Sequence, residues 1–303
     1  IAVSDTSDAK PLEAELQRAH KMEAIGTLAG GVAHDLNNIL SGIVSYPELI
    51  LLDIPDDSPL KQPLMTSKAS GERAAAIVQD LLTLARRGVA NKQPVNLNET
   101  ISSFLDSPEC HKILSFHPDV HLKTVLSEDL FWIYASPVHL SKTVMNLVSN
   151  ALEAQPNGGR VVISTYNRNF DMPEKGYENI RQGDFVTLSV SDTGCGISEQ
   201  DKERIFEPFY TKKVMGRSGT GLGMAVVWGT VQDHKGHIDV TSQPDKGTTF
   251  YLYFPATREI AQCAQTSIPA SEFMGDGQVI LIVDEAQNLS FDVLEQLRLL
   301  SNI

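Results

Sequence analysis

Apolar residues recur every three or four positions through the early part of the chain, which is the spacing of one face of an α-helix. One such series consists of Ile25, Leu28, Val32, Leu36, Ile39 and Ile43. The helical pattern starts at Pro11 and ends in a turn rich in proline and aspartate at residues 53–59. The pattern predicts a long amphipathic helix in which His34 lies outside the apolar stripe.

A second apolar series follows the turn and alternates between spacings of four and three, as in a heptad repeat. Its members are Leu60, Leu64, Ser67, Gly71, Ala74, Val78, Leu81 and Ala85. Two helices joined by a short turn predict an antiparallel hairpin, and a single hairpin leaves apolar surface exposed. We therefore expect two hairpins to close a four-helix bundle in a homodimer, with the small residues of the series permitting close helix contact.

From Asn91 onward the pattern changes to short β-rich segments separated by polar turns. Strands are expected at residues 120–126, 130–134, 160–166, 184–192, 237–242 and 248–255, and helices at 137–154 and 224–231. Helices layered on a mixed sheet are the simplest packing of these segments. The predicted fold class is α+β, with a long antiparallel helical hairpin followed by an α/β sandwich.

Charge and cysteine content narrow the class of protein. The formal net charge of −13 argues against a nucleic-acid partner, which would favour a basic surface. Three cysteines without C-x-x-C spacing indicate a reducing compartment. No apolar run is long enough to span a membrane, so we expect a cytoplasmic chain whose membrane sensor, if any, lies upstream. A start on Ile1 and an end within an apparent helix suggest a fragment.

Candidate chemistry begins at His34 and Asp35, with Asn38 one helical turn further on. An imidazole beside a carboxylate is held in one tautomer with a nucleophilic nitrogen available, and that nitrogen can accept a phosphoryl group. A solvated polar helix face is the alternative. Asn146 and Asn150 are also four apart on a predicted helix, and carboxamide oxygens can bind Mg²⁺ that carries nucleotide phosphates. Two solvated asparagines are the alternative there.

Polar and glycine-rich segments follow the predicted strands. Asp192 could accept a hydrogen bond from an exocyclic amine, while glycines in residues 194–196 let the backbone pass close to a flat base; an ordinary turn is the alternative. The loop 216–223 precedes a helix, and its amides would favour phosphate, although such loops also occur as linkers. Lys213 could neutralise phosphate charge, and the Thr248 hydroxyl could reach a base edge.

The order and spacing of these motifs resemble a bacterial two-component sensor histidine kinase over roughly residues 12–255. The H box, N box, first glycine box, F box and second glycine box of that family resemble residues 34–38, 146–150, 192–196, 206–209 and 219–223. The resemblance implies an ATP-binding fold shared with gyrase and heat-shock ATPases, attached to a dimeric hairpin. The expected division is a linker or signalling helix at 1–21, a phosphotransfer hairpin at 22–90, an ATP-binding domain at 91–256, a linker at 257–277 and a tail at 278–303.

The same resemblance assigns roles to individual residues. His34 would be the phosphoacceptor, Asn150 the principal Mg²⁺ ligand with Asn146 assisting, and Asp192 the adenine reader. The residues expected to hold ATP and Mg²⁺ are Asn146, Asn150, Glu153, Asp192, Gly194, Gly196, Phe209, Lys213, Gly219, Thr220, Gly221, Leu222, Gly223 and Thr248. The expected activity is ATP-dependent autophosphorylation of His34, followed by transfer to an aspartate of a response regulator receiver domain. An acid followed three residues later by asparagine, as in Asp35 and Asn38, is typical of family members that also dephosphorylate their regulators.

Two other functions are compatible with a nucleotide site. A hydrolytic ATPase of the gyrase or heat-shock type would need a carboxylate near the N box, where Asn146 stands instead. A dimeric scaffold could bind ATP without transferring phosphate. In the tail, residues 278–285 resemble the opening strand of a receiver domain, and the continuation at residues 284–302 also resembles the acidic-strand segment of an ATPase associated with secretion, so we expect a truncated or recombined end. His234 and His237 are interpreted as surface residues.

Overall fold

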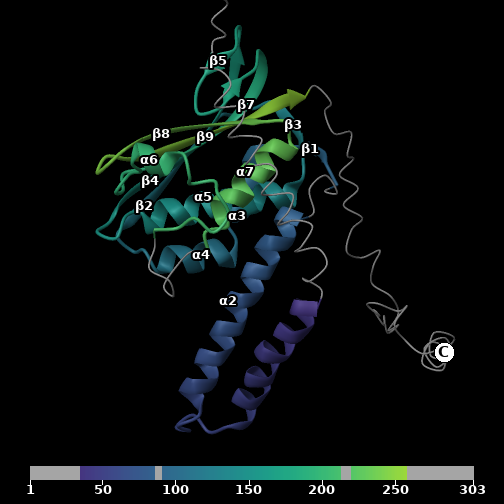
Figure 1. The fold of residues 1–303 in the computed structure, drawn as a ribbon, viewed down its shortest axis with the longest axis vertical. Helices are drawn as coiled ribbons and strands as arrows, with labels where there is room; N and C mark the ends of the chain where they lie inside the picture. Colours follow the sequence, from purple (N-terminus) through teal and green to yellow (C-terminus); the bar gives the residue numbers. More distant parts are fainter. Residues whose placement is uncertain (1–34, 86–90, 213–219, 258–303) are drawn as a thin grey trace, which may run out of the picture. The chain divides into compact units, whose positions relative to one another are not determined.

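The computed structural model describes residues 35–85, 91–212 and 220–257, and these form a helical hairpin and an α/β sandwich (Figure 1). The predicted α+β class is confirmed. His34, Lys213 and Gly219 lie outside the described residues, as does the tail from residue 258. The expectation of a receiver-like segment in that tail stays a prediction.

The hairpin consists of a helix at residues 35–53 and α2 (Lys61–Ala85), joined by a turn. The helices approach closely at Gly71, where an added Cβ would lie 2.9 Å from Cγ2 of Val44. Lys68 Nζ lies 2.8 Å from Glu48 Oε1 across the same pair of helices. These contacts confirm the antiparallel hairpin and explain the glycine in the apolar series.

One stripe of the helix at 35–53 stays exposed within the single chain. Its members recur at alternating spacings of three and four: Leu36, Ile39, Ile43, Tyr46 and Ile50, which are 37%, 61%, 44%, 69% and 44% exposed. Such a continuous apolar stripe is unusual on a surface that faces only water. The stripe has the spacing of a seam between helices.

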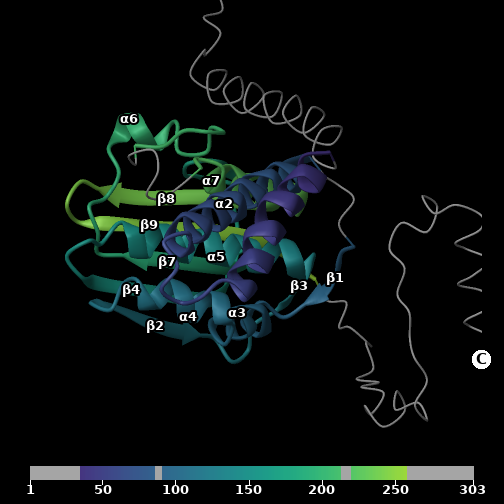
Figure 2. The same cartoon turned by 90° about the horizontal axis from the view of Figure 1, so that it is seen from below.

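The sandwich contains a seven-stranded mixed sheet. Its strands are β1 (Gln93–Val95), β2 (Val120–Leu126), β3 (Trp132–Ala135), β4 (Gly159–Phe170), β7 (Gly183–Asp192), β8 (His237–Gln243) and β9 (Gly247–Thr257). The main order is β1-β3-β9-β7-β4-β2, and β8 pairs with β9. β2 and β4 are parallel, and the other pairs are antiparallel. Figure 2 shows β8, β9, β7, β4 and β2 side by side.

Helices cover one face of this sheet. They are α3 (Leu97–Leu105), α4 (Pro108–Ser115), α5 (Pro137–Glu153) and α7 (Gly223–Asp233), with a short α6 (Glu199–Lys202) before the F-box segment. α5 packs between α3 and α7 and against β7. Alternate strand residues such as Ile163, Leu188 and Leu252 are fully buried against the α5 residues Val144 and Val148. This core fixes α5 and α7, the two helices that carry candidate site residues.

Sequence periodicity was sufficient for the long elements and insufficient for the short ones. The strands expected at 160–166, 184–192, 237–242 and 248–255 lie within β4, β7, β8 and β9. α3 and α4 were not predicted. Each is short, and each is started by a side-chain cap, where Asn96 accepts from Asn98 N and Ser107 accepts from Cys110 N. The two-stranded sheet of β5 (Glu174–Lys175) and β6 (Asn179–Ile180) was also missed.

Within the described ranges, no helix is long and apolar enough to cross a membrane.

Candidate functional site

Asp192 ends β7 as a buried carboxylate and is 7% exposed. Its Oδ1 accepts hydrogen bonds from Gly194 N at 2.8 Å and from Thr248 N at 3.3 Å. Burial raises the pKa of Asp192 above its ordinary value, and the two backbone donors act in the opposite direction. The carboxylate is therefore held between its own turn and the start of β9. Thr248 lies beside it, with its hydroxyl oxygen 2.9 Å from that of Ser242.

The glycines after Asp192 are required by the protein's own packing. Gly196 has φ of 69°, and an added Cβ would lie 2.0 Å from the carbonyl oxygen of Gln243. At Gly194 the same atom would lie 2.5 Å from the carbonyl oxygen of Ala154, just after α5. We expected these glycines to leave room for a base. In the structure they let the loop pass between α5 and the end of β8.

Two asparagines and a glutamate lie along α5. Asn146 is 9% exposed, and its Nδ2 donates to the carbonyl oxygen of Gly223 at 3.1 Å. Asn150 and Glu153 are half-buried further along the helix, where Glu153 Oε1 accepts from Ser149 Oγ at 3.3 Å. The bond from Asn146 joins α5 directly to the first residue of α7.

The loop before α7 is fixed by the segment that precedes it in sequence. Phe209 N donates to the carbonyl oxygen of Gly221 at 3.0 Å. Gly221 has φ of 70°, and a Cβ there would lie 2.5 Å from the carbonyl carbon of Phe209, so only glycine fits. Leu222 is fully buried, while Leu222 N donates to Thr220 Oγ1 at 3.2 Å. The F-box and second-glycine-box segments are thus in direct contact.

Asp201 binds the residues that follow the F box. Its carboxylate accepts from the side chains of Ser198, Tyr210 and Lys212. The Lys212 ammonium and the two hydroxyl donors keep the pKa of Asp201 well below its usual range. The same contact raises the pKa of Lys212. Asp201 could not be singled out from the sequence, because one acid in a polar turn carries no periodic signal.

The hairpin contributes Asp35 and Asn38, which are both exposed on the helix at 35–53. In the sandwich, the structure brings together three of the predicted groups. They are Asp192 with Gly194 and Thr248; Asn146 with Gly223; and Phe209 with Gly221. Asp192 ends β7 and Thr248 lies at the start of β9, while Asn146 lies in the middle of α5 and Gly223 begins α7.

The donor set around α5 offers a divalent cation the carboxamide oxygens of two asparagines. Among the described residues, no cluster of three histidine, cysteine, aspartate or glutamate side chains could bind a metal. Asn146 uses its amide nitrogen on Gly223, so its carbonyl oxygen is the atom that can act as a ligand. Mg²⁺ commonly keeps one or two protein ligands and completes its shell with phosphate and water oxygens. The pair Asn146 and Asn150 is compatible with that coordination.

His234 is buried, contrary to the interpretation from sequence, and only 6% exposed. Its Nε2 accepts from Ser136 N at 2.9 Å, and its Nδ1 lies 2.6 Å from the carbonyl oxygen of Thr230. Burial lowers the pKa of His234 below its ordinary value of 6.5, and Lys92 lowers it further. This histidine therefore joins the end of α7 to the start of α5 as a neutral ring.

Two family models match the chain. Residues 24–89 match the His Kinase A (phospho-acceptor) domain, and residues 135–258 match the histidine kinase-, DNA gyrase B-, and HSP90-like ATPase domain. Among solved structures, full-length ShkA in complex with AMPPNP has a TM-score of 0.60 at 22% identity, over 76% of this chain and 46% of that one. That likeness concerns the fold.

Curated relatives match most of the chain. Sensor kinase CckA of Brucella abortus (strain 2308) is 32% identical over 94% of this chain and 31% of its own length. Sensor histidine kinase ZraS of Escherichia coli (strain K12) is 31% identical over 80% of this chain and 48% of its own length. The chain thus spans between about a third and a half of these relatives.

Proposed function

Because the chain belongs to the sensor histidine kinases, carrying both a phosphoacceptor and an ATPase domain, we propose that it autophosphorylates His34 from ATP. The phosphoryl group then passes to an aspartate of a response regulator receiver domain. We assign phosphotransfer to residues 22–90 and ATP binding to residues 91–256.

The hydrogen bond from Asn146 to Gly223 carries this proposal most directly. It joins α5, which carries the N box, to the start of α7, which follows the second glycine box. Phe209 is bonded to Gly221 in the loop just before α7. Backbone amides at a helix N-terminus favour phosphate, so the phosphates belong beside Thr220–Gly223. The buried carboxylate of Asp192 suits an exocyclic amine of adenine.

Asn150 and Asn146 would hold Mg²⁺ through their carbonyl oxygens, with Glu153 beside them on α5. Bound with ATP, Mg²⁺ would neutralise phosphate charge as the transferred group leaves. Lys213, Gly219 and the following loop residues would supply the remaining positive charge and amide donors. This assignment extends the sequence expectation and is supported by the placement of Asn146.

In the proposed reaction an imidazole nitrogen of His34 attacks the γ-phosphorus of ATP. A P–N bond forms, the bond between phosphorus and the bridging oxygen breaks, and ADP leaves with that oxygen. The ring gives up a proton, and Asp35 either orients the ring or takes this proton. Catalysis is mostly positioning, because a phosphoryl transfer needs little covalent help from the protein.

Radiolabelled ATP tests this function against its two alternatives. An autokinase predicts acid-labile, base-stable label on the wild-type chain and none on His34→Gln. Release of inorganic phosphate at equal rates by both chains would instead identify a hydrolytic ATPase. ATP binding without label or phosphate release would identify a scaffold.

Regulator phosphatase activity is a second proposed activity, favoured by the exposure of Asn38 one turn after His34 and Asp35. A carboxamide at that position can orient water toward a phosphorylated aspartate. Asn38→Ala should slow dephosphorylation of a phosphorylated receiver at least about tenfold while leaving autophosphorylation close to wild type. Unchanged dephosphorylation would remove this activity from the proposal.

The phosphoacceptor domain implies a dimer, and the exposed stripe supports one. The members of the stripe from Ile39 to Tyr46 recur at the spacing with which helices pack in a four-helix bundle. We propose that two copies of the chain join through this stripe.

A further inference from the structure

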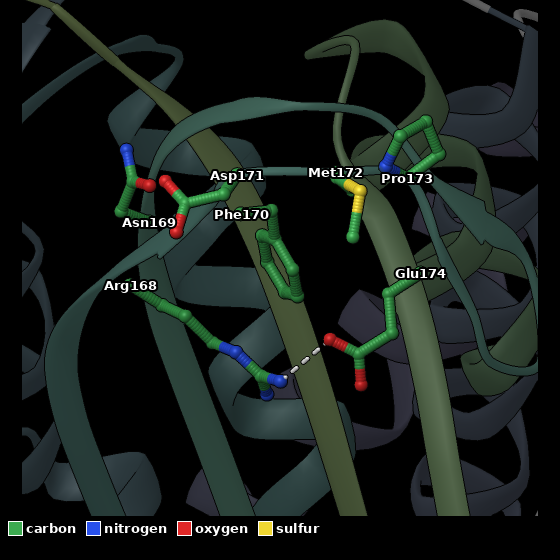
Figure 3. A pocket seen from close by; sticks show the side chains of 7 residues that line it. All are labelled: Arg168, Asn169, Phe170, Asp171, Met172, Pro173 and Glu174. Carbon is green, nitrogen blue, oxygen red and sulfur yellow. Dashed lines mark hydrogen bonds and ion pairs between the residues drawn. The ribbon is translucent and has the colours of Figure 1, made fainter.

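The connection between β4 and β7 leaves the sheet and returns, and we call its residues 171–182 the strap. Pairing of β4 with β7 continues to Phe170 and Gly183, and the strap between them contains β5 and β6. Arg168 fixes its base. Nη2 of Arg168 lies 2.9 Å from Glu174 Oε2, and the guanidinium carbon lies 4.3 Å from the centre of the Phe170 ring (Figure 3).

The strap is attached to β8 at two points. Ile238 N donates to Glu178 Oε2 at 3.1 Å, and Tyr177 N donates to Asp239 Oδ1 at 2.8 Å. β8 has β9 as its strand partner on one side only. The strap therefore contacts β8 and satisfies the backbone N–H of Ile238, which an edge strand would otherwise present to other chains.

The carboxylate of Glu178 also binds α7. Trp228 Nε1 donates to Glu178 Oε1 at 2.8 Å, and Gln232 Nε2 donates to the same atom at 2.9 Å. Trp228 is 2% exposed and Glu178 is half-buried, so this bond lies at the edge of the core. Hydrogen bonds to an ionised acceptor are stronger than those between neutral groups. One side chain thus connects the strap, β8 and the middle of α7.

Tyr177, the residue before Glu178, contacts the F box at residues 206–209. The rings of Tyr177 and Phe206 meet edge to face, with centroids 5.2 Å apart. Phe206 is fully buried and also contacts Phe250, at 6.4 Å between centroids. The strap therefore touches both segments that flank Thr220–Gly223, namely the F-box segment before this loop and α7 after it.

We propose that Glu178 is a positioning residue for ATP. It holds α7 where the carbonyl oxygen of Gly223 meets the amide of Asn146, and so sets the loop and the N-box helix relative to each other. This inference rests on the proposed ATP binding. Replacing one carboxylate oxygen by an amide group would place a donor against the N–H groups of Trp228, Gln232 or Ile238 and release α7. ATP affinity then falls by about tenfold, because small misplacements of binding groups are costly.

The test uses the full chain with His34→Gln, so that nucleotide is bound and not consumed. ATP with Mg²⁺ is titrated into this parent and into versions that also carry Glu178→Gln or Glu174→Gln. Glu174 is the matched control, since it lies on the same strap and forms an ion pair with Arg168 at the base of the strap. We expect the dissociation constant to rise about tenfold for Glu178→Gln and to change less than twofold for Glu174→Gln.

A double-variant cycle tests whether the effect passes through α7. Trp228→Phe keeps a buried ring and removes the indole N–H. We expect it to weaken ATP binding less than Glu178→Gln, and the double variant to bind no more weakly than Glu178→Gln alone. Amide hydrogen exchange without nucleotide should be faster in α7 for Glu178→Gln, and unchanged for Glu174→Gln. If the factors by which Trp228→Phe and Glu178→Gln each weaken ATP binding multiplied in the double variant, the effect of Glu178 would not pass through Trp228 and α7.

The outcomes separate the two proposals. If the parent binds no ATP, both the proposed function and the role of Glu178 fail. If the parent binds ATP and Glu178→Gln binds it equally well, only the role of Glu178 fails, even where the melting temperature falls. That last combination would mean that the strap stabilises the sheet without positioning the nucleotide site.

Discussion

The hairpin and the sandwich differ in the burial of their apolar residues. In the sandwich, Ile163, Leu188 and Leu252 are fully buried within one chain. In the hairpin, Ile39 and Tyr46 remain 61% and 69% exposed although they repeat in a regular stripe. A core that closes within one chain can place loops accurately, whereas a stripe left open needs a second surface. The sandwich therefore closes its core within one copy, whereas the described part of the hairpin leaves an apolar stripe open.

The largest expected effect comes from placing a charge on the open stripe. Ile39→Asp removes a buried isoleucine from each copy in the dimer, a loss of roughly 4 kcal/mol for the pair. The dissociation constant should therefore rise about a thousandfold, as measured by analytical ultracentrifugation. Val138→Asp is the control, since Val138 is 75% exposed on α5 in the sandwich. A dimer equally weakened by both changes, or by neither, would contradict the comparison.

The same substitution, glycine to alanine, is expected to change the free energy of unfolding differently in the two regions. At Gly196 the added Cβ meets Gln243 O at 2.0 Å with φ of 69°, so Gly196→Ala should lower the free energy of unfolding by roughly 3 kcal/mol. At Gly42 in the hairpin, the nearest described atom to the added Cβ belongs to the Tyr46 ring, at 3.5 Å. Gly42→Ala should be neutral or stabilise by up to about 1 kcal/mol. Urea unfolding measures both, and equal losses would show that the loop geometry is not the cause.

A smaller effect is the pH dependence of stability that His234 gives to the sandwich. His234 is neutral in the folded sandwich, and its pKa lies below the ordinary 6.5. The unfolded chain therefore takes up more protons as pH falls below 6.5, so this contribution to stability is complete above that pH and is lost below it. One histidine contributes at most about 1.4 kcal/mol per pH unit.

Thermal unfolding between pH 8 and pH 5 checks the role of His234. Burial also lowers the pKa of His139 and of His237. All three histidines therefore contribute to a wild-type melting temperature that falls as the pH falls. His234→Gln should reduce the slope, and His111→Gln, at an exposed position on α4, should leave it unchanged. An identical slope in the wild type and His234→Gln would show that His234 is not the group involved.

Sequence patterns predicted the elements that are long and periodic. The heptad series from Leu60 to Ala85 corresponds to α2, and Ser136–Pro137 does mark the start of α5. The motif residues Asn146 and Gly223 were expected to share a site, and the structure places them in hydrogen-bond contact. The motifs carried this information because their order is that of a known family.

What could not be predicted depends on contacts between distant positions. Glu178 lies in a polar segment without periodicity, and its partners Trp228 and Ile238 are far along the chain. His234 looked like a surface residue because a polar ring after a helix usually is one. Its burial follows from the return of the chain past Ser136, which no local pattern contains. The packing of Gly194 against Ala154 and of Gly196 against Gln243 likewise joins positions that are far apart in the sequence, so no local pattern contains it.

The bond between Trp228 and Glu178 also gives the protein an optical reporter. The chain has two tryptophans, and Trp132, at the start of β3, is the other. With Trp132→Phe, the emission spectrum would come from Trp228 alone. An indole whose N–H meets a carboxylate emits differently from one that has lost that partner. The colour of its fluorescence can therefore follow α7 in real time, without a dye.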